Sequence, residues 1–395
     1  MTAAPIRVML YSHDAQGLGH LRRNLALAHH LAQGLPSLTG APVTGMVITG
    51  LAPGEGFDLP EGFDWLVLPG VAKGADGYEP RRLGVSRTEL GLMRSSLLDA
   101  ALSSFAPDLL IVDRHPYGVR QELRDPLRSL KRRHPRAKVV LGLREVLDTP
   151  DALAREWSAL GSTELLRELV DHVWVYGDPA VHDLVDTGEA PTGLIDRIRF
   201  TGYLAHGRSE AEAQVEPYTT PFVLTTAGGG SDGYDLLLAA AAMKPPIGHE
   251  HVVVTGPQLS DEEFLSIAAA GGSRTLVRRT WPGMSRHVAD ASAVISMGGY
   301  NTICEILSTS TPALIVPREV PRLEQLIRAR GLEQAGAVDL MRSQDVDSSA
   351  LGAWAASMVG RQVSRAHLDL DGLAAVPRLA RELLRGPRLI EGRVA

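Results

Sequence analysis

The sequence predicts an α/β fold in which two doubly wound, Rossmann-like domains face a central cleft. Short apolar, β-branched runs alternate with helical patterns along the chain, and this alternation is typical of doubly wound sheets. Most of these runs are apolar at every position, as expected for parallel strands that helices cover on both faces. A chain of 395 residues has room for two domains of ordinary size.

The expected strands fall into two sets, separated by a stretch in which the apolar pattern lapses. The first set covers residues 7–10, 43–49, 65–68, 109–112, 139–141 and 173–176, and the second covers 222–225, 251–255, 276–278, 293–296 and 313–316. The lapse lies near 201–218, which places the two domains at 1–205 and 206–375. We expect the remainder, 376–395, to form a C-terminal helix and tail that packs back on the first domain.

Composition narrows the classes of function. The formal net charge of -6 offers no overall attraction to nucleic acid, so we expect no nucleic-acid partner. The single cysteine, Cys304, excludes a disulfide framework and a thiolate zinc site. The sequence shows neither a signal-peptide pattern nor the roughly 20-residue apolar run that spans a bilayer, so we expect a cytoplasmic protein.

Basic residues gather locally in spite of the acidic total. The stretch 120–138 is rich in arginine and lysine and holds only Glu122 and Asp125 as acidic residues. One interpretation is a solvated helix face. The other is a patch that meets an anionic acceptor or places the protein peripherally at the inner face of a membrane. The pair Arg22-Arg23 allows the same two interpretations, a solvent-facing role or contact with an anionic acceptor.

Three glycine-rich loops leave expected strands and enter expected helices, where open α/β sheets bind ligands. In the first loop, Gly17 and Gly19 allow close approach of the backbone to a ligand, and His20 begins the helix. An imidazole there can take a proton from an acceptor hydroxyl near neutral pH, and Asp14 is the neighbouring carboxylate. The alternative is a simple turn followed by a histidine at a helix start.

The second loop leads from the strand 222–225 into a helix over 234–242. It contains Gly228, Gly229, Gly230 and Ser231 in succession. Consecutive N–H groups in such a turn form a nest suited to a diphosphate. No Gly-Lys-Ser/Thr follows, so the loop does not predict ATP hydrolysis. The alternative is a flexible loop.

The third loop follows the strand 293–296 and again places small residues at a helix start. Its members are Gly298, Gly299, Asn301 and Thr302. Glu305 lies about one and a half turns into the helix, where a carboxylate suits the two hydroxyls of a ribose.

Other polar residues lie at the ends of neighbouring strands. Glu324 and Gln325 open a helix after the strand 313–316 and suit the hydroxyls of a hexose. Asp113, His115 and Arg144 follow strands of the first half and are candidates for the acceptor side of the cleft. For Arg144, contact with a phosphate and an ion pair with a nearby carboxylate are both open.

At this point the second half resembles the nucleotide-binding domain of MurG-type glycosyltransferases, which make the second sugar linkage of the peptidoglycan precursor. The resemblance is strongest over 284–338, where the segments 289–296, 298–305, 311–317, 324–325 and 336–337 follow the family's order and spacing. The turn at 228–231 is similar to the family's diphosphate loop. The loop at 17–20 is similar to its first glycine-rich loop, histidine included.

The resemblance implies the GT-B fold, a uridine or similar nucleoside diphosphate sugar as donor, and inversion at the anomeric carbon. It implies that Glu305 holds the ribose, that Gln325 with Glu324 holds the donor sugar, and that Ser231 with its neighbouring amides holds the diphosphate. His20 would be the base or would position the acceptor. No metal ion and no further cofactor are implied.

The resemblance also implies that the nucleobase lies near Arg279 and Trp281, in the loop before Met284. Two departures concern the substrates. Glu324-Gln325 stands where the family has paired glutamines, which bears on the donor sugar. The residues after His20 differ from the family's apolar, proline-containing turn, which bears on the acceptor. The opening, residues 12–23, is similar to a branch of MurG-like predicted glycosyltransferases.

The sequence thus predicts an inverting glycosyltransferase that moves a hexose or N-acetylhexosamine from a nucleotide sugar, with UDP as the expected nucleotide. The acceptor hydroxyl belongs to a small molecule, a glycan or a lipid-linked compound. Helix N-termini are expected to stabilise the leaving diphosphate in place of a metal ion. Two alternatives use the same donor loops: a nucleotide-sugar 2-epimerase and a non-catalytic nucleotide-sugar-binding protein.

Overall fold

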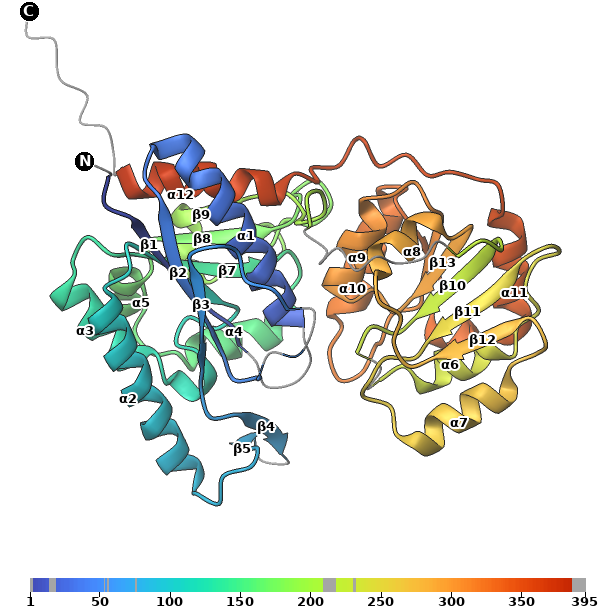
Figure 1. The fold of residues 1–395 in the computed structure, drawn as a ribbon, viewed down its shortest axis with the longest axis horizontal. Coiled ribbons are helices and arrows are strands. Elements are labelled where there is room, and N and C mark those ends of the chain that lie inside the picture. The colour runs from blue at the N-terminus through green and yellow to red at the C-terminus, as the bar shows by residue number, and fades with distance from the viewer. Residues whose placement is uncertain are drawn as a thin grey trace, which may run out of the picture.

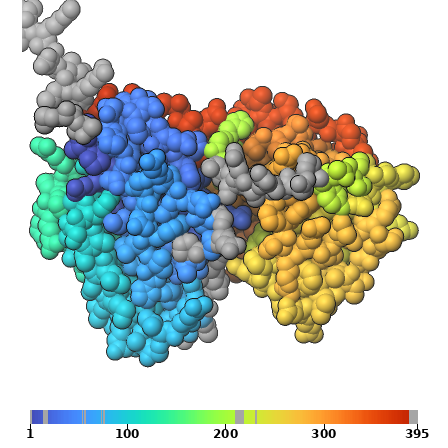
Figure 2. Space-filling model, in the orientation of Figure 1, coloured from blue at the N-terminus to red at the C-terminus, as the bar shows by residue number. Residues whose placement is uncertain are grey.

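The computed structural model describes residues 3–13, 19–52, 54, 57–74, 77–208, 218–229 and 232–385. They form two lobes, each built on a parallel sheet between helices (Figures 1 and 2). The last helix returns from the second lobe to the first (Figure 1).

The first lobe is built on a 7-stranded sheet in the order β3-β2-β1-β6-β7-β8-β9, and every neighbouring pair in it is parallel. Its strands are β1 (Ile6–Tyr11), β2 (Val43–Thr49), β3 (Phe63–Val67), β6 (Leu109–Asp113), β7 (Lys138–Arg144), β8 (His172–Tyr176) and β9 (Ile198–Phe200). Two further strands, β4 (Val71–Gly74) and β5 (Gly77–Pro80), form a separate antiparallel hairpin.

The second lobe is built on a 6-stranded parallel sheet in the order β12-β11-β10-β13-β14-β15. Its strands are β10 (Phe222–Thr226), β11 (Glu250–Val254), β12 (Thr275–Arg278), β13 (Ala293–Ser296), β14 (Ala313–Ile315) and β15 (Asp339–Leu340). The central strands β10 and β13 are buried at every position, which explains their unbroken apolar character.

Helices cover both sheets. The first lobe has α1 (Gly19–Thr39), α2 (Arg87–Phe105), α3 (Arg124–Arg133), α4 (Pro150–Ser158) and α5 (Thr163–Leu169), with 3-10 turns η1 (Val119–Gln121) and η2 (Thr192–Arg197). The second has α6 (Tyr234–Ala241), α7 (Asp261–Ala270), α8 (Met284–Asp290), α9 (Tyr300–Leu307), α10 (Glu324–Gln334) and α11 (Ser348–Met358), with the turn η3 (Ser343–Asp345). Capping boxes, Ser86 with Glu89 and Ser260 with Glu263, fix the starts of α2 and α7.

The last helix, α12 (Gly372–Arg385), packs along α1 of the first lobe. The two helices approach closely at Gly34, where an added Cβ would lie 2.6 Å from the ring of Pro377. A glycine is therefore required at this crossing unless the helices move apart. The chain passes between the two lobes at two places, in the segment before β10 and in the segment before α12.

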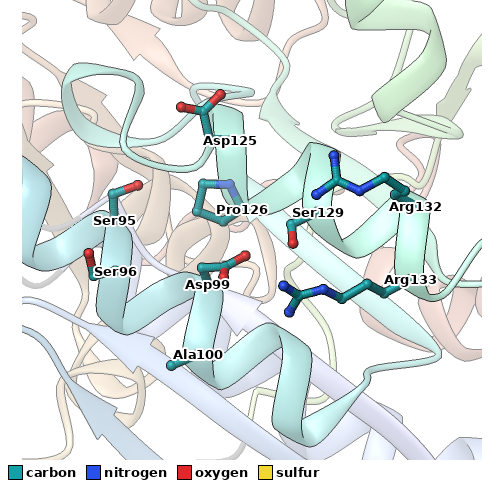
Figure 3. Close-up of a pocket in the computed structure, with 9 residues that line it drawn as sticks. All are labelled: Ser95, Ser96, Asp99, Ala100, Asp125, Pro126, Ser129, Arg132 and Arg133. Atoms are coloured by element: carbon teal, nitrogen blue, oxygen red, sulfur yellow. The ribbon is translucent and has the colours of Figure 1, made fainter.

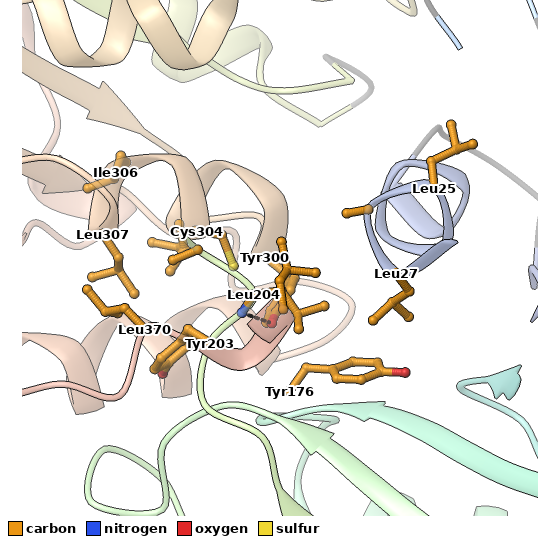
Figure 4. Packing of buried hydrophobic residues seen from close by; sticks show 14 of the residues in the cluster. Leu25, Leu27, Tyr176, Tyr203, Leu204, Tyr300, Cys304, Ile306, Leu307 and Leu370 are labelled. Carbon is orange, nitrogen blue, oxygen red and sulfur yellow. Dashed lines mark hydrogen bonds between the residues drawn. The ribbon is translucent and has the colours of Figure 1, made fainter. Parts of the chain in front are cut away.

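One hydrophobic core runs through both lobes. It includes Leu27 and Tyr176 of the first lobe and Tyr300 of α9 in the second (Figure 4). The segment between the lobes lies in the same core, where the Tyr300 hydroxyl accepts a hydrogen bond from the backbone N–H of Leu204 at 3.2 Å. The ring of Tyr203 stacks beside that of Tyr300 with centroids 6.4 Å apart. This packing fixes α9 beside α1.

The predicted fold class is confirmed, and each expected strand overlaps an observed one. The short strands β4, β5, β9 and β15 were not predicted, because they are too short for a pattern to show. Helix α1 continues to Thr39, with Pro36 inside it. None of the helices in the described part of the chain combines the length and apolar content needed to cross a membrane.

Candidate active site

The two sheets place the candidate loops at equivalent positions. The strand order reverses beside β1 and β6 in the first sheet and beside β10 and β13 in the second. Ligands bind outside the carboxyl ends of parallel strands at such reversals. His20 follows β1 and Asp113 ends β6, whereas Gly228 follows β10 and Gly298 follows β13.

His20 forms a pair with Asp113. Its Nδ1 lies 2.5 Å from Asp113 Oδ2, and a guanidinium nitrogen of Arg23 lies 2.5 Å from Asp113 Oδ1. The same Arg23 nitrogen is 3.1 Å from His20 Nδ1. The His20 side chain keeps 23% of its surface exposed, whereas those of Asp113 and Arg23 keep only 2% and 3%. The buried Asp113 carboxylate therefore orients the imidazole of His20, which remains accessible to a ligand.

The neighbours of Asp113 stabilise its ionised form. Burial alone would raise the pKa of this carboxyl, but Arg23 and His20 outweigh it and keep the pKa well below its usual range. The position of Arg23 overturns a solvent-facing role for that residue, since its guanidinium is buried between Asp113 and the rings of Tyr176 and Tyr300. Arg22 is exposed.

Four predicted residues lie outside the described residues: Asp14 and Gly17 of the first loop, and Gly230 and Ser231 of the second. Asp14 was predicted as the carboxylate that neighbours His20. The carboxylate that the structure places there is Asp113, which was predicted only as an acceptor-side residue.

The described part of the second loop lies close to the end of β11. Gly228 has φ +66°, and the backbone N–H of Gln258 donates to the Gly229 carbonyl at 3.1 Å. A Cβ on Gly256, which has φ +87°, would lie 2.5 Å from the Gly228 oxygen. Thus glycine is needed at Gly256 for two reasons, its backbone conformation and the close approach of the loop.

The third loop meets both of the others. The side-chain amide of Asn301 donates to the Gly19 carbonyl at 2.9 Å, and its oxygen accepts from Arg208 at 3.2 Å. A Cβ on Gly228 would lie 3.9 Å from the Thr302 hydroxyl. Asn301 therefore joins α9 to the first lobe through its amide nitrogen and to the segment between the lobes through its amide oxygen, and the three glycine-rich loops converge beside α9.

The carboxylates predicted for the donor differ in their surroundings. Glu305 is buried on α9, where 9% of the residue stays exposed. Glu324 begins α10, and its Oε2 lies 2.6 Å from the Arg144 guanidinium of the other lobe. Burial would raise the pKa of Glu324, but Arg144 and Arg328 lower it to about 2. The structure thus gives Arg144 a carboxylate partner, one of the two roles that the sequence left open.

The neighbouring loop is held to the start of α10. The Gln325 side-chain oxygen accepts from the Arg318 backbone N–H at 2.9 Å. The Arg318 guanidinium pairs with Asp232 and lies 3.6 Å from Glu324. The loop after β14 is thereby connected to the second glycine-rich loop through charged side chains.

A second ion pair between the lobes was not predicted from the sequence. Arg328 of α10 lies 2.6 Å from Glu145, which follows β7, and both side chains are fully buried. Arg328 also donates to the Gly298 carbonyl at 3.2 Å. No local signal marks this pair, because its members are 183 positions apart.

The residues predicted to lie near a nucleobase have packing roles. The ring of Trp281 stacks on His287 with centroids 3.5 Å apart, so that face is covered. Arg279 pairs with Asp261 and lies over the ring of Phe264. Met284 begins α8 and is packed against the main core.

His13, Tyr78 and Glu156 belong to the polar cluster near His20 and were not predicted from the sequence. The ring of His13 lies between His20 and His115, and its Nε2 is 3.0 Å from the Tyr78 hydroxyl. His115 in turn lies 3.1 Å from Glu156. Tyr78 comes from the unpredicted β4–β5 hairpin, and Glu156 comes from α4, so only the tertiary structure brings them together.

A hollow of about 420 Å³ lies between α2 and α3, away from the loops (Figure 3). Its walls include Asp99 and Ala100 of α2 and Arg132 and Arg133 of α3. Within the described ranges, no group of three or more histidine, cysteine, aspartate or glutamate residues is arranged to hold a metal ion.

The comparison with known families concerns the second lobe. Residues 226–358 match the C-terminal domain of glycosyltransferase family 28. This segment is therefore similar to a family 28 glycosyltransferase domain. It contains the described parts of the second and third glycine-rich loops together with Glu305, Glu324 and Gln325. An uncharacterised glycosyltransferase of Methanosarcina mazei is 28% identical over 147 residues, which are 36% of this chain and 37% of that protein.

Solved structures share the fold over nearly the whole chain. MurG of Acinetobacter baumannii matches with a TM-score of 0.57 and 14% identity, over 95% of this chain and 99% of that one. A protein described as a UDP-N-acetylglucosamine 2-epimerase from Listeria monocytogenes matches with a TM-score of 0.57 and 13% identity, over 95% and 92%. The chain therefore has the GT-B fold, and the family 28 domain confirms the resemblance to MurG-like proteins.

Proposed function

We propose that the protein is an inverting glycosyltransferase that moves a hexose or N-acetylhexosamine from a nucleoside diphosphate sugar to an acceptor hydroxyl. The observation that carries this proposal is the pairing of an accessible His20 with the buried carboxylate of Asp113, beside the family 28 domain. Donor binding alone would need no such pair. A base oriented by a carboxylate is what activation of a hydroxyl requires.

In the proposed step, the acceptor hydroxyl gives its proton to His20 Nε2 while its oxygen attacks the anomeric carbon. The bond from that carbon to the diphosphate oxygen breaks, and the diphosphate leaves with the electron pair. Asp113 accepts the hydrogen bond from Nδ1 and stabilises the imidazolium that forms. The carboxylate thereby selects Nε2 as the nitrogen that takes the proton.

The donor side of the proposal rests on helix starts. Helix α9 begins after Gly299, and α6 begins after Gly233, both at the strand-order reversal of the second sheet. Free N–H groups at these ends favour the charge that develops on the leaving diphosphate. We propose that Glu305 holds the ribose, that Glu324 and Gln325 hold the sugar, and that no metal ion is needed. UDP is the expected nucleotide.

A donor screen tests this proposal. Purified protein is heated with UDP-, dTDP- and GDP-sugars, and any stabilising donor is then assayed for slow hydrolysis and for transfer, with and without EDTA. We expect a UDP-sugar to raise the melting temperature, because binding to the folded state alone stabilises it. Turnover should persist in EDTA. If none of the donors stabilises the protein or is consumed, the proposal is wrong.

The epimerase alternative is favoured by one observation, the shared fold of the Listeria protein. The same assay separates the two reactions. An epimerase would isomerise the donor sugar in the absence of any acceptor, and the sugar would remain attached to the nucleotide. A non-catalytic binding protein would be stabilised by the donor but would neither hydrolyse nor transfer it.

We also propose that the protein contacts an anionic membrane surface through α2, α3 and the residues after α3. The exposed basic residues there are Arg128, Arg132, Arg133 and Arg136. Next to them, α2 exposes Leu92, Met93 and Leu97, which keep 65%, 41% and 42% of their surface accessible. Basic side chains beside exposed apolar ones suit an anionic lipid interface. Figure 3 shows two of these arginines, Arg132 and Arg133, at the hollow between α2 and α3.

Vesicle sedimentation tests this contact. We expect binding to phosphatidylglycerol-containing vesicles, little binding to phosphatidylcholine vesicles, and a loss of at least about tenfold in Arg128→Glu/Arg132→Glu, since each basic residue near the surface contributes about 1 kcal/mol. Arg286→Glu, an exposed position in the second lobe, serves as the control. Equal binding to both vesicle types, or no loss in the double variant, would contradict the proposal.

A further inference from the structure

A cluster of polar rings lies beside His20 on the first lobe. The centroid of the His13 ring is 5.9 Å from that of His20 and 4.4 Å from that of His115. The Tyr78 hydroxyl lies 3.0 Å from His13 Nε2. His13 follows β1 and lies next to His20, while His115 of the loop after β6 and Tyr78 of strand β5 both contact His13. The surface next to the proposed base is therefore made of hydrogen-bonding rings.

These rings are neutral near pH 7. Burial lowers the pKa of His13 well below the ordinary value, and the neighbouring His115 and His20 act in the same direction. Burial also lowers the pKa of His115, although Glu156 acts against it. A neutral imidazole has one donor and one acceptor, as a hydroxyl group also has.

Hydrogen-bonding capacity remains in the cluster. His13 is only 6% exposed, and its Nδ1 has no partner among the residues that the structure describes. His115 engages Glu156 through Nδ1, which directs its other nitrogen elsewhere. A buried polar atom without a partner is costly, so such an atom indicates a missing ligand or water.

Two arginines near the cluster have carboxylate partners. Arg114 lies 2.8 Å from Glu156, and Arg322 of the other lobe lies 3.7 Å from Asp148. Both arginines act on Tyr78 and tend to lower the pKa of its hydroxyl, although burial raises it overall. Cations that already have carboxylate partners favour an anionic ligand less than free ones would.

We propose that His13, Tyr78 and His115 form an acceptor subsite for a neutral, hydroxyl-rich molecule of the sugar or polyol class. The inference rests on the proposed glycosyltransferase function and specifies its acceptor. One hydroxyl of that molecule faces His20, gives up its proton and receives the sugar, while adjacent hydroxyls bind the three rings. An aromatic acceptor without such hydroxyls would leave the polar atoms of these rings without partners.

The test uses the full chain, the donor found in the screen and three acceptor classes at equal concentration. N-acetylglucosamine and myo-inositol represent hydroxyl-rich acceptors, 2-naphthol represents aromatic ones, and glycerol 3-phosphate represents anionic ones. We expect kcat/KM for a hydroxyl-rich acceptor to exceed that for the other classes by at least about tenfold, the effect of one or two hydrogen bonds.

Variants of Tyr78 and His115 test whether the preference for hydroxyl-rich acceptors depends on these rings. Tyr78→Phe removes one oxygen and keeps the ring, and it should lower kcat/KM for the hydroxyl-rich acceptor about tenfold and reduce the preference over naphthol. His115→Phe should act in the same direction. His367→Phe, an exposed histidine of the other lobe that bonds the Ala335 carbonyl, should retain the preference.

Some outcomes would contradict only the acceptor subsite, and others would contradict the proposed function as well. Preference for the naphthol or the phosphate compound, or an unchanged preference in both Tyr78→Phe and His115→Phe, would overturn the subsite. Donor hydrolysis without transfer to any of the hydroxyl-rich acceptors would also overturn it, while leaving an enzyme that consumes the donor. A donor that is neither bound nor consumed would overturn the proposed function, and the subsite with it.

Discussion

Replacing His20 with alanine is expected to lower kcat about 10²–10⁴-fold while donor affinity changes little. The reason is the division of the site between the lobes. His20 lies on the first lobe against Asp113, whereas the proposed donor contacts lie on the family 28 domain. Removing the imidazole takes away the proton acceptor and leaves those contacts in place. Transfer kinetics measure kcat, and calorimetry with the non-reacting nucleotide measures donor affinity.

Asp113→Asn provides a second test of the same pair. The amide keeps the size of the side chain but removes the charge that favours the imidazolium, so kcat should fall here too. His29→Ala is the matched control, because His29 lies on the same helix, α1, and bonds the Asp58 carbonyl at 2.9 Å. Unchanged kcat in His20→Ala would remove His20 from the role of base. Equal losses in His20→Ala and His29→Ala would point to damage to α1.

The fold was predictable because its signals are local. The strands β1, β6, β10 and β13 each contain a buried apolar run of at least three residues, and such runs are typical of parallel sheets whatever the rest of the chain does. The hairpin β4–β5 escaped prediction because each of its strands has four residues, one of which is a glycine. The sequences of these two strands cannot be distinguished from that of an ordinary turn.

The candidate site was predictable only in part, for a related reason. Glycines that follow strands can be found in the sequence, so the convergence of the loops at the strand-order reversals was expected. The partners of the charged residues could not be found in this way. His20 and Asp113 are 93 positions apart, and Arg144 and Glu324 are 180 apart. The first pairing depends on β1 and β6 being neighbours in one sheet, and the second depends on how the lobes meet.

Arg23 illustrates the same limit within a single helix. It stands next to Arg22, and the two look equivalent in the sequence. Consecutive helical residues point in directions about 100° apart. Arg22 is exposed, whereas Arg23 turns inward to Asp113. The solvent-facing role, one of the two interpretations of this pair, is therefore wrong for Arg23.

Breaking the buried pair of Arg328 with Glu145 is expected to cost about 3–5 kcal/mol of unfolding free energy, because the remaining charge would be buried without a partner. Both side chains are fully buried, and Arg328 also bonds the Gly298 carbonyl of the third loop. Arg328→Met and Glu145→Gln should therefore each destabilise the protein strongly. Urea denaturation followed by fluorescence measures the loss.

A double-mutant cycle separates the charge from the packing. Arg328→Met/Glu145→Gln should cost clearly less than the sum of the two single changes, because neither variant side chain then leaves an unpaired ion. Arg286→Met is the control: its exposed pair with Asp290, at 3.3 Å, should contribute no more than about 1 kcal/mol. Additive losses would show that Arg328 stabilises the protein through the Gly298 carbonyl and its packing. A small loss in both single variants would show that the lobes are not held by this ion pair.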